Sequence, residues 1–344
     1  MSGASTLSTP AAGAPGAGAD TAWKRALRDA VRDPDELIDL LGLPDGFREP
    51  ARRAARLFPL VVPRDLVARM RPGDPADPIL RQVLPLDAEA EHAAGFSDDP
   101  VGDRAATIAP GLIQKYPGRV LLLAAGTCAI NCRFCFRRNF PYGNLPRGLP
   151  SFKPALERIA ADPSIHEVIL SGGDPLVLGD GVLARLAGQL AAIPHVKRLR
   201  VHSRLPVAVP QRVSAPLLGW LRSTRLAPIM VVHVNHPAEL GGGCPEALCR
   251  LVDAGIPVLS QTVLLRGVND DSEVLAGLFE QLTDLRVLPY YLHQLDPVRG
   301  AAHFHVSEAR GREIMSDLRR RLSGYAVPRY VREEQGAESK VVLA

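Results

Sequence analysis

The chain has 344 residues, of which 46% are hydrophobic and 23% are charged, and its formal net charge is +4 at pH 7. These values are typical of a soluble globular protein with one large domain or two, and they give no indication of nucleic-acid binding. No apolar run reaches the roughly 18 residues of a membrane-spanning helix, so we expect no membrane segment. Five cysteines are too few for a secreted disulfide scaffold, which favours a reducing, cytoplasmic location.

Two regions of different character precede the first strand pattern. Segment 1–20 is rich in Ala, Gly, Ser and Pro and lacks the basic start and apolar core of a secretion signal, so we predict disorder there. Residues 21–105 contain helical stretches such as WKRALRDAVRD and EPARRAARLF, which Asp and Pro clusters interrupt. We expect this helical N-terminal region to pack against a larger domain.

Strand and helix patterns alternate from about residue 119 onward. Helix-compatible stretches separate six apolar, β-rich runs at 119–125, 167–173, 196–204, 228–236, 257–265 and 287–295. This alternation predicts parallel βα units. Six units favour an α/β fold of the incomplete (β/α)6 barrel type over residues 106–306, with an open doubly wound sheet as the alternative. A last helix, SEARGREIMSDLRRRL, opens the C-terminal segment 307–344, which ends in a short tail.

Polar residues recur at the carboxyl ends of the predicted strands. Loops at that end of a parallel barrel converge on one mouth, where active sites lie. Any one of these residues could be a structural polar group, but their recurrence on six successive strands favours a shared site. The set comprises the cysteine loop, Ser171 to Asp174, His202 to Arg204, His233 and Asn235, Gln261, and Gln294 and Asp296.

The loop after the first strand carries three cysteines in the order Cys128-Ala-Ile-Asn-Cys132-Arg-Phe-Cys135. Three thiolates on a 4Fe-4S cluster leave one iron open, which S-adenosylmethionine (SAM) can chelate. A zinc site would need a fourth ligand, and the remaining thiols, Cys244 and Cys249, lie far along the chain. Three buried free thiols are the other alternative. The spacing directly after a strand favours a radical SAM cluster site, and we assign no metal role to Cys244 or Cys249.

Seven motifs are similar to those of the lysine 2,3-aminomutase family of radical SAM enzymes. They span about residues 100 to 344 and read QKYPGRVLLLAAGTCAINCRFCFRRNFPY, SGGDPL, RVHSRLPV, HVNHP, SQTVLLRGVND, YYLHQLD and SGYAVPRYV. The C-terminus GAESKVVLA resembles the branch that acts with elongation factor P β-lysylation, because other members carry a glycine-rich run before the lysine and a longer tail. The resemblance implies a radical SAM partial barrel that also uses pyridoxal 5′-phosphate (PLP).

The resemblance implies PLP-binding residues at the start of the predicted barrel segment and in the tail that follows it. Lys340 matches the lysine whose amine binds PLP covalently; without the resemblance it would be taken for a solvated residue of a polar tail. The PLP phosphate needs cations and hydroxyl donors, and we assign Lys115, Tyr116 and Arg119, just before the first strand, to this role. Their alternative interpretation is a surface loop.

The resemblance also implies residues for SAM. The loop Ser171, Gly172, Gly173 and Asp174 is similar to the one that holds the methionine amino group and ribose of SAM. We expect the glycine pair to let the backbone approach a ligand closely. Further residues of the SAM or PLP pocket are expected at His202, His233 and Gln261.

Three charged residues match the positions that bind lysine as substrate. Arg137 suits the substrate carboxylate, because a planar guanidinium makes a two-pronged contact with it. Asp296 and Glu333 match the two acidic positions that face the distal ammonium, although longer members of the family have aspartate where Glu333 stands. The added methylene moves that carboxylate by about 1.5 Å. Taken alone, Asp296 could be a helix cap or an ion-pair partner.

Together these residues imply an isomerase that converts L-α-lysine to (R)-β-lysine, with a 4Fe-4S cluster, SAM and PLP as cofactors. The implied partners are an electron donor such as flavodoxin or ferredoxin, and a ligase that loads β-lysine onto elongation factor P. The family also suggests a homo-oligomer. The alternatives are a radical SAM aminomutase for another amino acid or an attached lysine, and a non-catalytic iron–sulfur protein. The presence of both Lys340 and Arg137 argues against the last.

Overall fold

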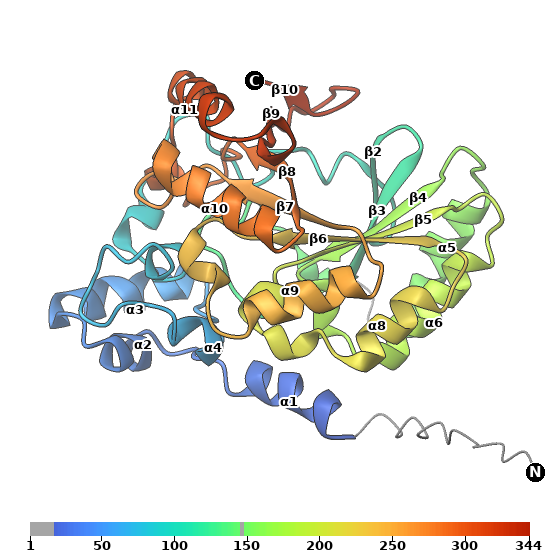
Figure 1. The fold of residues 1–344 in the computed structure, drawn as a ribbon, viewed down its shortest axis with the longest axis horizontal. Coiled ribbons are helices and arrows are strands. Elements are labelled where there is room, and N and C mark those ends of the chain that lie inside the picture. The colour runs from blue at the N-terminus through green and yellow to red at the C-terminus, as the bar shows by residue number, and fades with distance from the viewer. Residues whose placement is uncertain (1–16, 145–147) are drawn as a thin grey trace, which may run out of the picture.

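The computed structural model describes residues 17–144 and 148–344 of the chain (Figure 1). Helix α1 (Ala17–Arg28) begins inside segment 1–20, for which we predicted disorder. That prediction is wrong for residues 17–20, and its remaining part, 1–16, lies outside the described residues. Among the described helices, none combines the length and the apolar surface that a bilayer-spanning segment needs.

Six parallel strands form the centre of the sheet, and each corresponds to one of the predicted strands. They are β3 (Arg119–Ala125), β4 (Glu167–Gly172), β5 (Arg198–Ser203), β6 (Ala227–His233), β7 (Val258–Val263) and β8 (Leu288–His293). Strands adjacent in the chain are adjacent in the sheet, whose strand order runs from one edge to the other without a reversal. This order confirms the incomplete (β/α)6 barrel and rules out the doubly wound alternative, in which the strand order would reverse.

The helices that connect these strands lie on the outside of the sheet (Figure 1). They are α5 (Lys153–Ala160), α6 (Asp180–Ala191), the short α7 (Leu205–Ala208), α8 (Ala215–Arg222), α9 (Cys244–Asp253), α10 (Ser272–Asp284) and α11 (Glu308–Arg321). Helix α10 illustrates why they form. The Asp271 side chain accepts from the backbone of Glu273 and Val274 at its start, and apolar residues such as Leu275 and Phe279 are buried against the core.

Each edge of the sheet carries strands that the sequence analysis did not predict. Strand β2 (Leu112–Tyr116) pairs antiparallel with β3, and β1 (Thr107–Ala109) pairs antiparallel with β2, where the sequence analysis assigned no strand. At the other edge, β9 (Arg329–Arg332) pairs parallel with β8, and β10 (Val341–Val342) pairs antiparallel with β9. The C-terminal tail is therefore part of the sheet. These strands have two to five residues, too short for a clear sequence pattern.

The N-terminal region packs against the cysteine loop. Its helices gather at one end of the molecule (Figure 1) and comprise α2 (Pro34–Leu41), α3 (Arg48–Leu57) and α4 (Arg64–Val67), followed by the 3-10 helices η2 (Leu80–Gln82) and η3 (Asp87–Ala90). The backbone amides of Asn131 and Arg133 donate to the carbonyls of Val61 and Gln82 at 3.0 and 2.9 Å. The buried guanidinium of Arg133 makes a two-pronged contact with Glu89, with distances of 2.8 Å (Nε–Oε1) and 2.5 Å (Nη2–Oε2). The loop between the cysteines is thus fixed from outside the barrel.

The contact between α11 and β9 generates a stability prediction. A Cβ added at Gly311 would lie 2.2 Å from the hydroxyl of Tyr330, which is fully buried. Gly311→Ala should therefore lower the free energy of unfolding by about 1–3 kcal/mol through overpacking. Gly277→Ala, in the middle of α10, meets no atom within 4 Å and should raise it by about 0.4–1 kcal/mol. Urea unfolding of the two variants measures both effects. If Gly311→Ala raised the free energy of unfolding as much as Gly277→Ala does, the packing of Gly311 against Tyr330 would be contradicted.

Candidate active site

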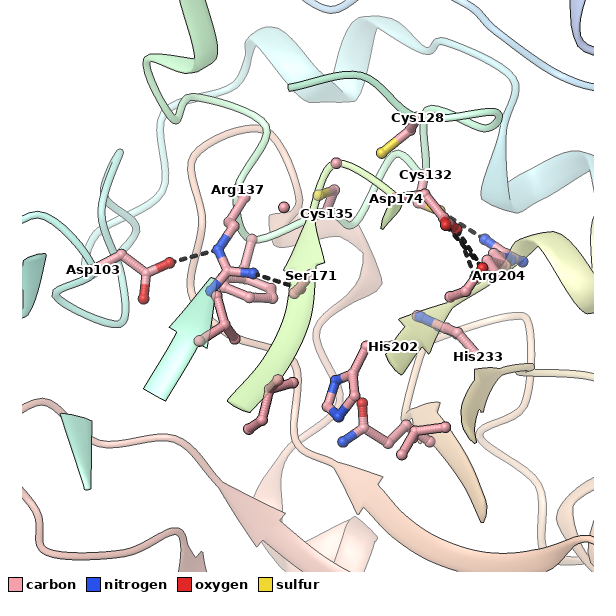
Figure 2. Close-up of a pocket in the computed structure, with 18 of the residues that line it drawn as sticks. Asp103, Cys128, Cys132, Cys135, Arg137, Ser171, Asp174, His202, Arg204 and His233 are labelled. Atoms are coloured by element: carbon pink, nitrogen blue, oxygen red, sulfur yellow. Dashed lines mark hydrogen bonds and ion pairs between the residues drawn. The ribbon is translucent and has the colours of Figure 1, made fainter. Parts of the chain in front are cut away.

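A cavity of about 870 Å³ lies within the barrel and at the carboxyl ends of its strands. Every residue that the sequence analysis assigned to the cluster, a cofactor or the substrate lines this cavity, from Lys115 on β2 to Lys340 beside β10. Two other polar residues at strand ends, Asn235 and Gln294, were also expected at the shared site but do not line it. Figure 2 shows the part that contains the cysteine loop and the ends of β4, β5 and β6. The fold therefore brings together residues from both ends of the chain, while the role of each one stays a prediction.

The three cysteines follow β3 on one loop and form one wall of the cavity (Figure 2). All three are free thiols. Burial raises the pKa of Cys128 well above its ordinary value and that of Cys135 to about 11, so both stay protonated until a cation binds. Within residues 17–144 and 148–344, no three His, Cys, Asp or Glu side chains converge on one metal ion. Three soft thiol ligands beside an open cavity fit an iron–sulfur cluster.

The glycine pair after β4 is required by the protein's own backbone. A Cβ at Gly172, whose φ is +123°, would lie 2.3 Å from the carbonyl oxygen of Ala125. A Cβ at Gly173 would lie 2.1 Å from the carbonyl oxygen of Thr127, at the start of the cysteine loop. The amide of Gly173 donates to Ala125 at 2.7 Å, and that of Asp174 donates to Thr127 at 2.9 Å. We expected these glycines to let the backbone approach a ligand, and that explanation is incomplete. They are needed first because the cysteine loop packs directly against them.

The carboxylate of Asp174 is fully engaged by neighbouring protein groups. It accepts from the hydroxyl of Ser203 at 2.8 and 2.9 Å, from the backbone amide of Arg204 at 2.8 Å, and from that of Leu176 at 3.0 Å. These bonds join the end of β4 to the end of β5 (Figure 2). Asp174 thus shapes the cavity wall.

Glu333 is the centre of a charged cluster at the open side of the barrel. The register of β10 against β9 pairs Val341 with Arg332, so Lys340 stands opposite Glu333, and their side chains form an ion pair. Glu333 also accepts from the hydroxyl of Tyr116 at 2.7 Å and lies 3.4 Å from the ammonium of Lys115. Burial alone would raise the pKa of Glu333, but the ammonium of Lys340 holds it below its ordinary value.

Arg137 is buried and held by a residue that the sequence analysis missed. Its Nε donates to Asp103 at 2.6 Å and its Nη1 lies 3.4 Å from the hydroxyl of Ser171 (Figure 2). Its guanidinium also stacks over the ring of Phe136. The other oxygen of Asp103 lies 2.8 Å from the ammonium of Lys115. Burial opposes the charges, yet Arg137 holds the pKa of Asp103 below its ordinary value. Asp103 thus holds Arg137 through Nε and not through a terminal nitrogen.

Several polar groups of the cavity have no strong partner within the protein. Among the described residues, no donor hydrogen-bonds to the carboxylate of Asp296, and burial raises its pKa to about 7. The Nε2 of His202 is buried without a partner, and burial lowers the pKa of this imidazole well below its ordinary value. Arg119 stacks on the ring of Tyr116, and in the described part of the chain no carboxylate pairs with it. Such groups are the ones that a bound ligand would satisfy.

His233 and Gln261 occupy neighbouring strands of the same cavity. The Nε2 of His233 lies 3.1 Å from the side-chain oxygen of Asn235, and burial lowers the pKa of the imidazole to about 4. His233 therefore stays neutral at physiological pH. Gln261 on β7 pairs in register with His233 on β6, which places the two side chains on the same face of the sheet.

No family model matches the chain, whereas curated proteins match it over most of its length. The L-lysine 2,3-aminomutase of Escherichia coli is 46% identical over 322 residues, covering 93% of this chain and 94% of that protein. The L-lysine 2,3-aminomutase of Haemophilus influenzae is 43% identical, covering 94% and 95%, and that of Clostridium subterminale is 35% identical, covering 92% and 76%. The chain belongs to the L-lysine 2,3-aminomutase family. The predicted resemblance is thereby confirmed.

Solved structures match less extensively. SuiB of Streptococcus suis bound to S-adenosylmethionine has a TM-score of 0.47 and 11% identity, covering 64% of this chain and 51% of that chain. A radical SAM methyltransferase from Sphaerobacter thermophilus has a TM-score of 0.43 and 20% identity, covering 64% and 68%.

Tyr142 and Asp103, which line the cavity of this family member, were not assigned to the site from sequence, and Arg204 was noted only as a polar residue at the end of a strand. Tyr142 donates to the carbonyl of Gly172 at 2.6 Å, and Arg204 donates to the sulfur of Cys132 at 2.7 Å. Both lie in motifs quoted for the lysine 2,3-aminomutase resemblance, which could have revealed them. Asp103 precedes the βα units and belongs to no such motif, so only its contacts with Arg137 and Lys115 identify it.

The pKa of Asp296 predicts how stability depends on pH. Because its pKa rises from an ordinary 3.8 to about 7 on folding, the folded state binds more protons than the unfolded state between these values. Stability should therefore fall as pH rises through this window. Asparagine keeps the shape of the side chain but does not titrate. The free energy of unfolding of Asp296→Asn, relative to that of the wild type, should therefore increase from pH 4 to pH 8. Urea unfolding of cofactor-free protein tests this, and a constant difference between the two proteins would contradict it.

Proposed function

We propose that this chain is a radical SAM, PLP-dependent L-lysine 2,3-aminomutase that converts L-α-lysine to (R)-β-lysine. The observation that supports it is one cavity that holds three free cysteines, Lys340, a buried guanidinium and two carboxylates. The reaction is an isomerisation in which the amino group moves from C2 to C3 while a hydrogen moves from C3 to C2. Atoms and electrons therefore balance without a further co-substrate.

The cysteine loop and the end of β4 are assigned to the cluster and SAM. When bound, the cluster and SAM supply a carbon-centred radical that removes a substrate hydrogen and later returns it. Cys128, Cys132 and Cys135 provide the thiolates, and segment 171–174 forms the adjacent wall for the methionine and ribose of SAM. His233 and Gln261, on β6 and β7, complete this part of the cavity.

The Lys340 side of the cavity is assigned to PLP. When bound, PLP carries the substrate amino group during its migration. Lys340 supplies the amine for covalent attachment, and its ion pair with Glu333 positions it in the cavity. Arg119, which pairs with no carboxylate in the described part of the chain, suits the phosphate together with Lys115 and Tyr116. His202 stays neutral and has a free ring nitrogen for a hydrogen bond to a cofactor.

The charges of the cavity suit lysine as substrate. Arg137, fixed through Nε by Asp103, offers its terminal nitrogens to the substrate carboxylate. Asp296 has no protein partner among the described residues and accepts the distal ammonium, whose charge favours the ionised carboxylate. Glu333 already contacts protein cations, so we assign it a secondary share in binding the ammonium.

We further propose that the product serves elongation factor P, through a ligase that loads β-lysine onto it. The high identity to the Escherichia coli and Haemophilus influenzae relatives over nearly their whole length supports this branch of the family. An electron donor such as flavodoxin or ferredoxin would reduce the cluster, and we expect a homo-oligomer. The decisive assay is anaerobic incubation of the reconstituted protein with lysine, SAM, PLP and a reductant, with β-lysine as the product detected.

Substitution of the cofactor ligands should separate the two cofactors. Cys128→Ala should lose cluster iron, about four irons per chain in the wild type, and abolish SAM cleavage. Cys249→Ala, a matched change on helix α9, should change neither. Lys340→Ala should lose covalent PLP binding and its yellow absorbance while retaining iron. Iron analysis and absorbance spectra of anaerobic protein measure these effects. Zinc in place of iron would contradict the radical SAM assignment.

Substrate charge gives a second prediction. Asp296→Asn removes the carboxylate charge and should lower kcat/KM for lysine about 10-fold to 150-fold, since a charge-assisted hydrogen bond contributes about 1.5–3 kcal/mol. Binding of SAM and PLP should be nearly unchanged. Norleucine, which lacks the distal amine, and glutamate should both be poor substrates for the wild type. Equal turnover of the three amino acids would remove the lysine assignment and leave an aminomutase of another substrate.

A further inference from the structure

Arg204 places a buried positive charge against one of the three cysteines. Its Nη1 donates to the sulfur of Cys132 at 2.7 Å. Among the described residues, no guanidinium or ammonium group hydrogen-bonds to the sulfur of Cys128 or Cys135. The three thiols therefore differ in their surroundings, and only one of them receives a charged donor.

We propose that Arg204 is a positioning residue that raises the reduction potential of the 4Fe-4S cluster through its hydrogen bond to Cys132. This inference rests on the proposed function, because it requires a cluster at the cysteine loop. A donor bonded to a cluster sulfur withdraws electron density, and a positive charge beside the cluster stabilises the more negative, reduced state. Arg204 would thus ease the electron transfer that must precede cleavage of SAM.

The guanidinium of Arg204 is fixed so that it cannot turn away from Cys132. Its Nη2 donates to Glu239 at 2.7 Å and to the side-chain oxygen of Gln82 at 2.6 Å. Its backbone amide donates to Asp174 at 2.8 Å. The side chain is only 7% exposed, so any other orientation would leave a buried charge without partners. Figure 2 shows Arg204 beside Cys132 and Asp174.

The partners of Arg204 are themselves fixed. Glu239, which is fully buried, accepts from the backbone amides of Asn235 and His236 at 2.9 and 3.1 Å. The side-chain amide of Gln82 donates to Glu239 at 3.1 Å and to the carbonyl of Pro78 at 2.9 Å. Residues from the N-terminal region and from the segment after β6 therefore converge on one guanidinium, which is more than a structural ion pair requires.

Glu239 also limits the distance over which the charge of Arg204 acts. Its carboxylate nearly cancels the charge of Arg204 for distant groups, so the influence is confined to Cys132 and the atoms next to it. This pairing predicts opposite consequences for two substitutions. Removing the guanidinium removes the donor, whereas removing the carboxylate charge leaves the guanidinium uncompensated.

The test uses the full chain with Arg204→Met, Arg204→Lys and Glu239→Gln. Each protein is reconstituted anaerobically with iron and sulfide, and the reduced cluster is followed by electron paramagnetic resonance during a redox titration. Arg204→Met should shift the midpoint potential to a more negative value, and Arg204→Lys should shift it less in the same direction. Glu239→Gln should shift it to a more positive value. Arg222→Met, an exposed change on α8, serves as the control and should leave it unchanged.

The outcomes separate this inference from the proposed function. A wild type that binds no iron contradicts the proposed function itself. A wild type with a cluster, but with the same midpoint potential in every variant, overturns the role of Arg204 alone. If Arg204→Met loses its iron, Glu239→Gln decides: a more positive potential supports the inference, and an unchanged one overturns it.

Discussion

The two edges of the open sheet are joined by side chains, and Glu333 is the residue that joins them. It follows β9 at one edge, while Tyr116 and Lys115 belong to β2 at the other, and Lys340 stands beside β10. A buried carboxylate needs such partners, because its desolvation is otherwise strongly unfavourable. The charged groups around Glu333 therefore complete the cavity wall where backbone pairing does not, and they place Lys340 in that wall.

The opposite wall depends on close contact between backbones. Gly172 and Gly173 let the start of the cysteine loop lie directly on the end of β4, and the N-terminal region holds the same loop from outside through Arg133 and Glu89. Under the proposed function, the groups offered to the substrate are Arg137, after the cysteine loop, and Asp296, after β8, which would suit an amino acid with charges at both ends.

The central strands were predictable because apolar residues recur in each of them, as a continuous run in β4 or in alternation with polar residues in β5 and β7. The cysteine spacing and the quoted motifs also led to the cavity residues, including Lys340. Strands β1, β2, β9 and β10 were not predictable, since their few residues carry no clear alternation and their pairing is set by neighbours distant in sequence. The sequence analysis did not assign Asp103 for a related reason, because only its contacts with Arg137 and Lys115 define its role.

The position of Glu333 in the chain has a consequence for the order of assembly. Glu333 and Tyr116, which meet at the open side of the barrel, are 217 positions apart in sequence. Contacts of such separation carry a large loop-closure cost until the intervening segments have folded. We therefore expect the βα units to form before the C-terminal hairpin docks. During that interval the barrel interior stays accessible, so under the proposed function the bulky cofactors would enter before the C-terminal strands dock and enclose them.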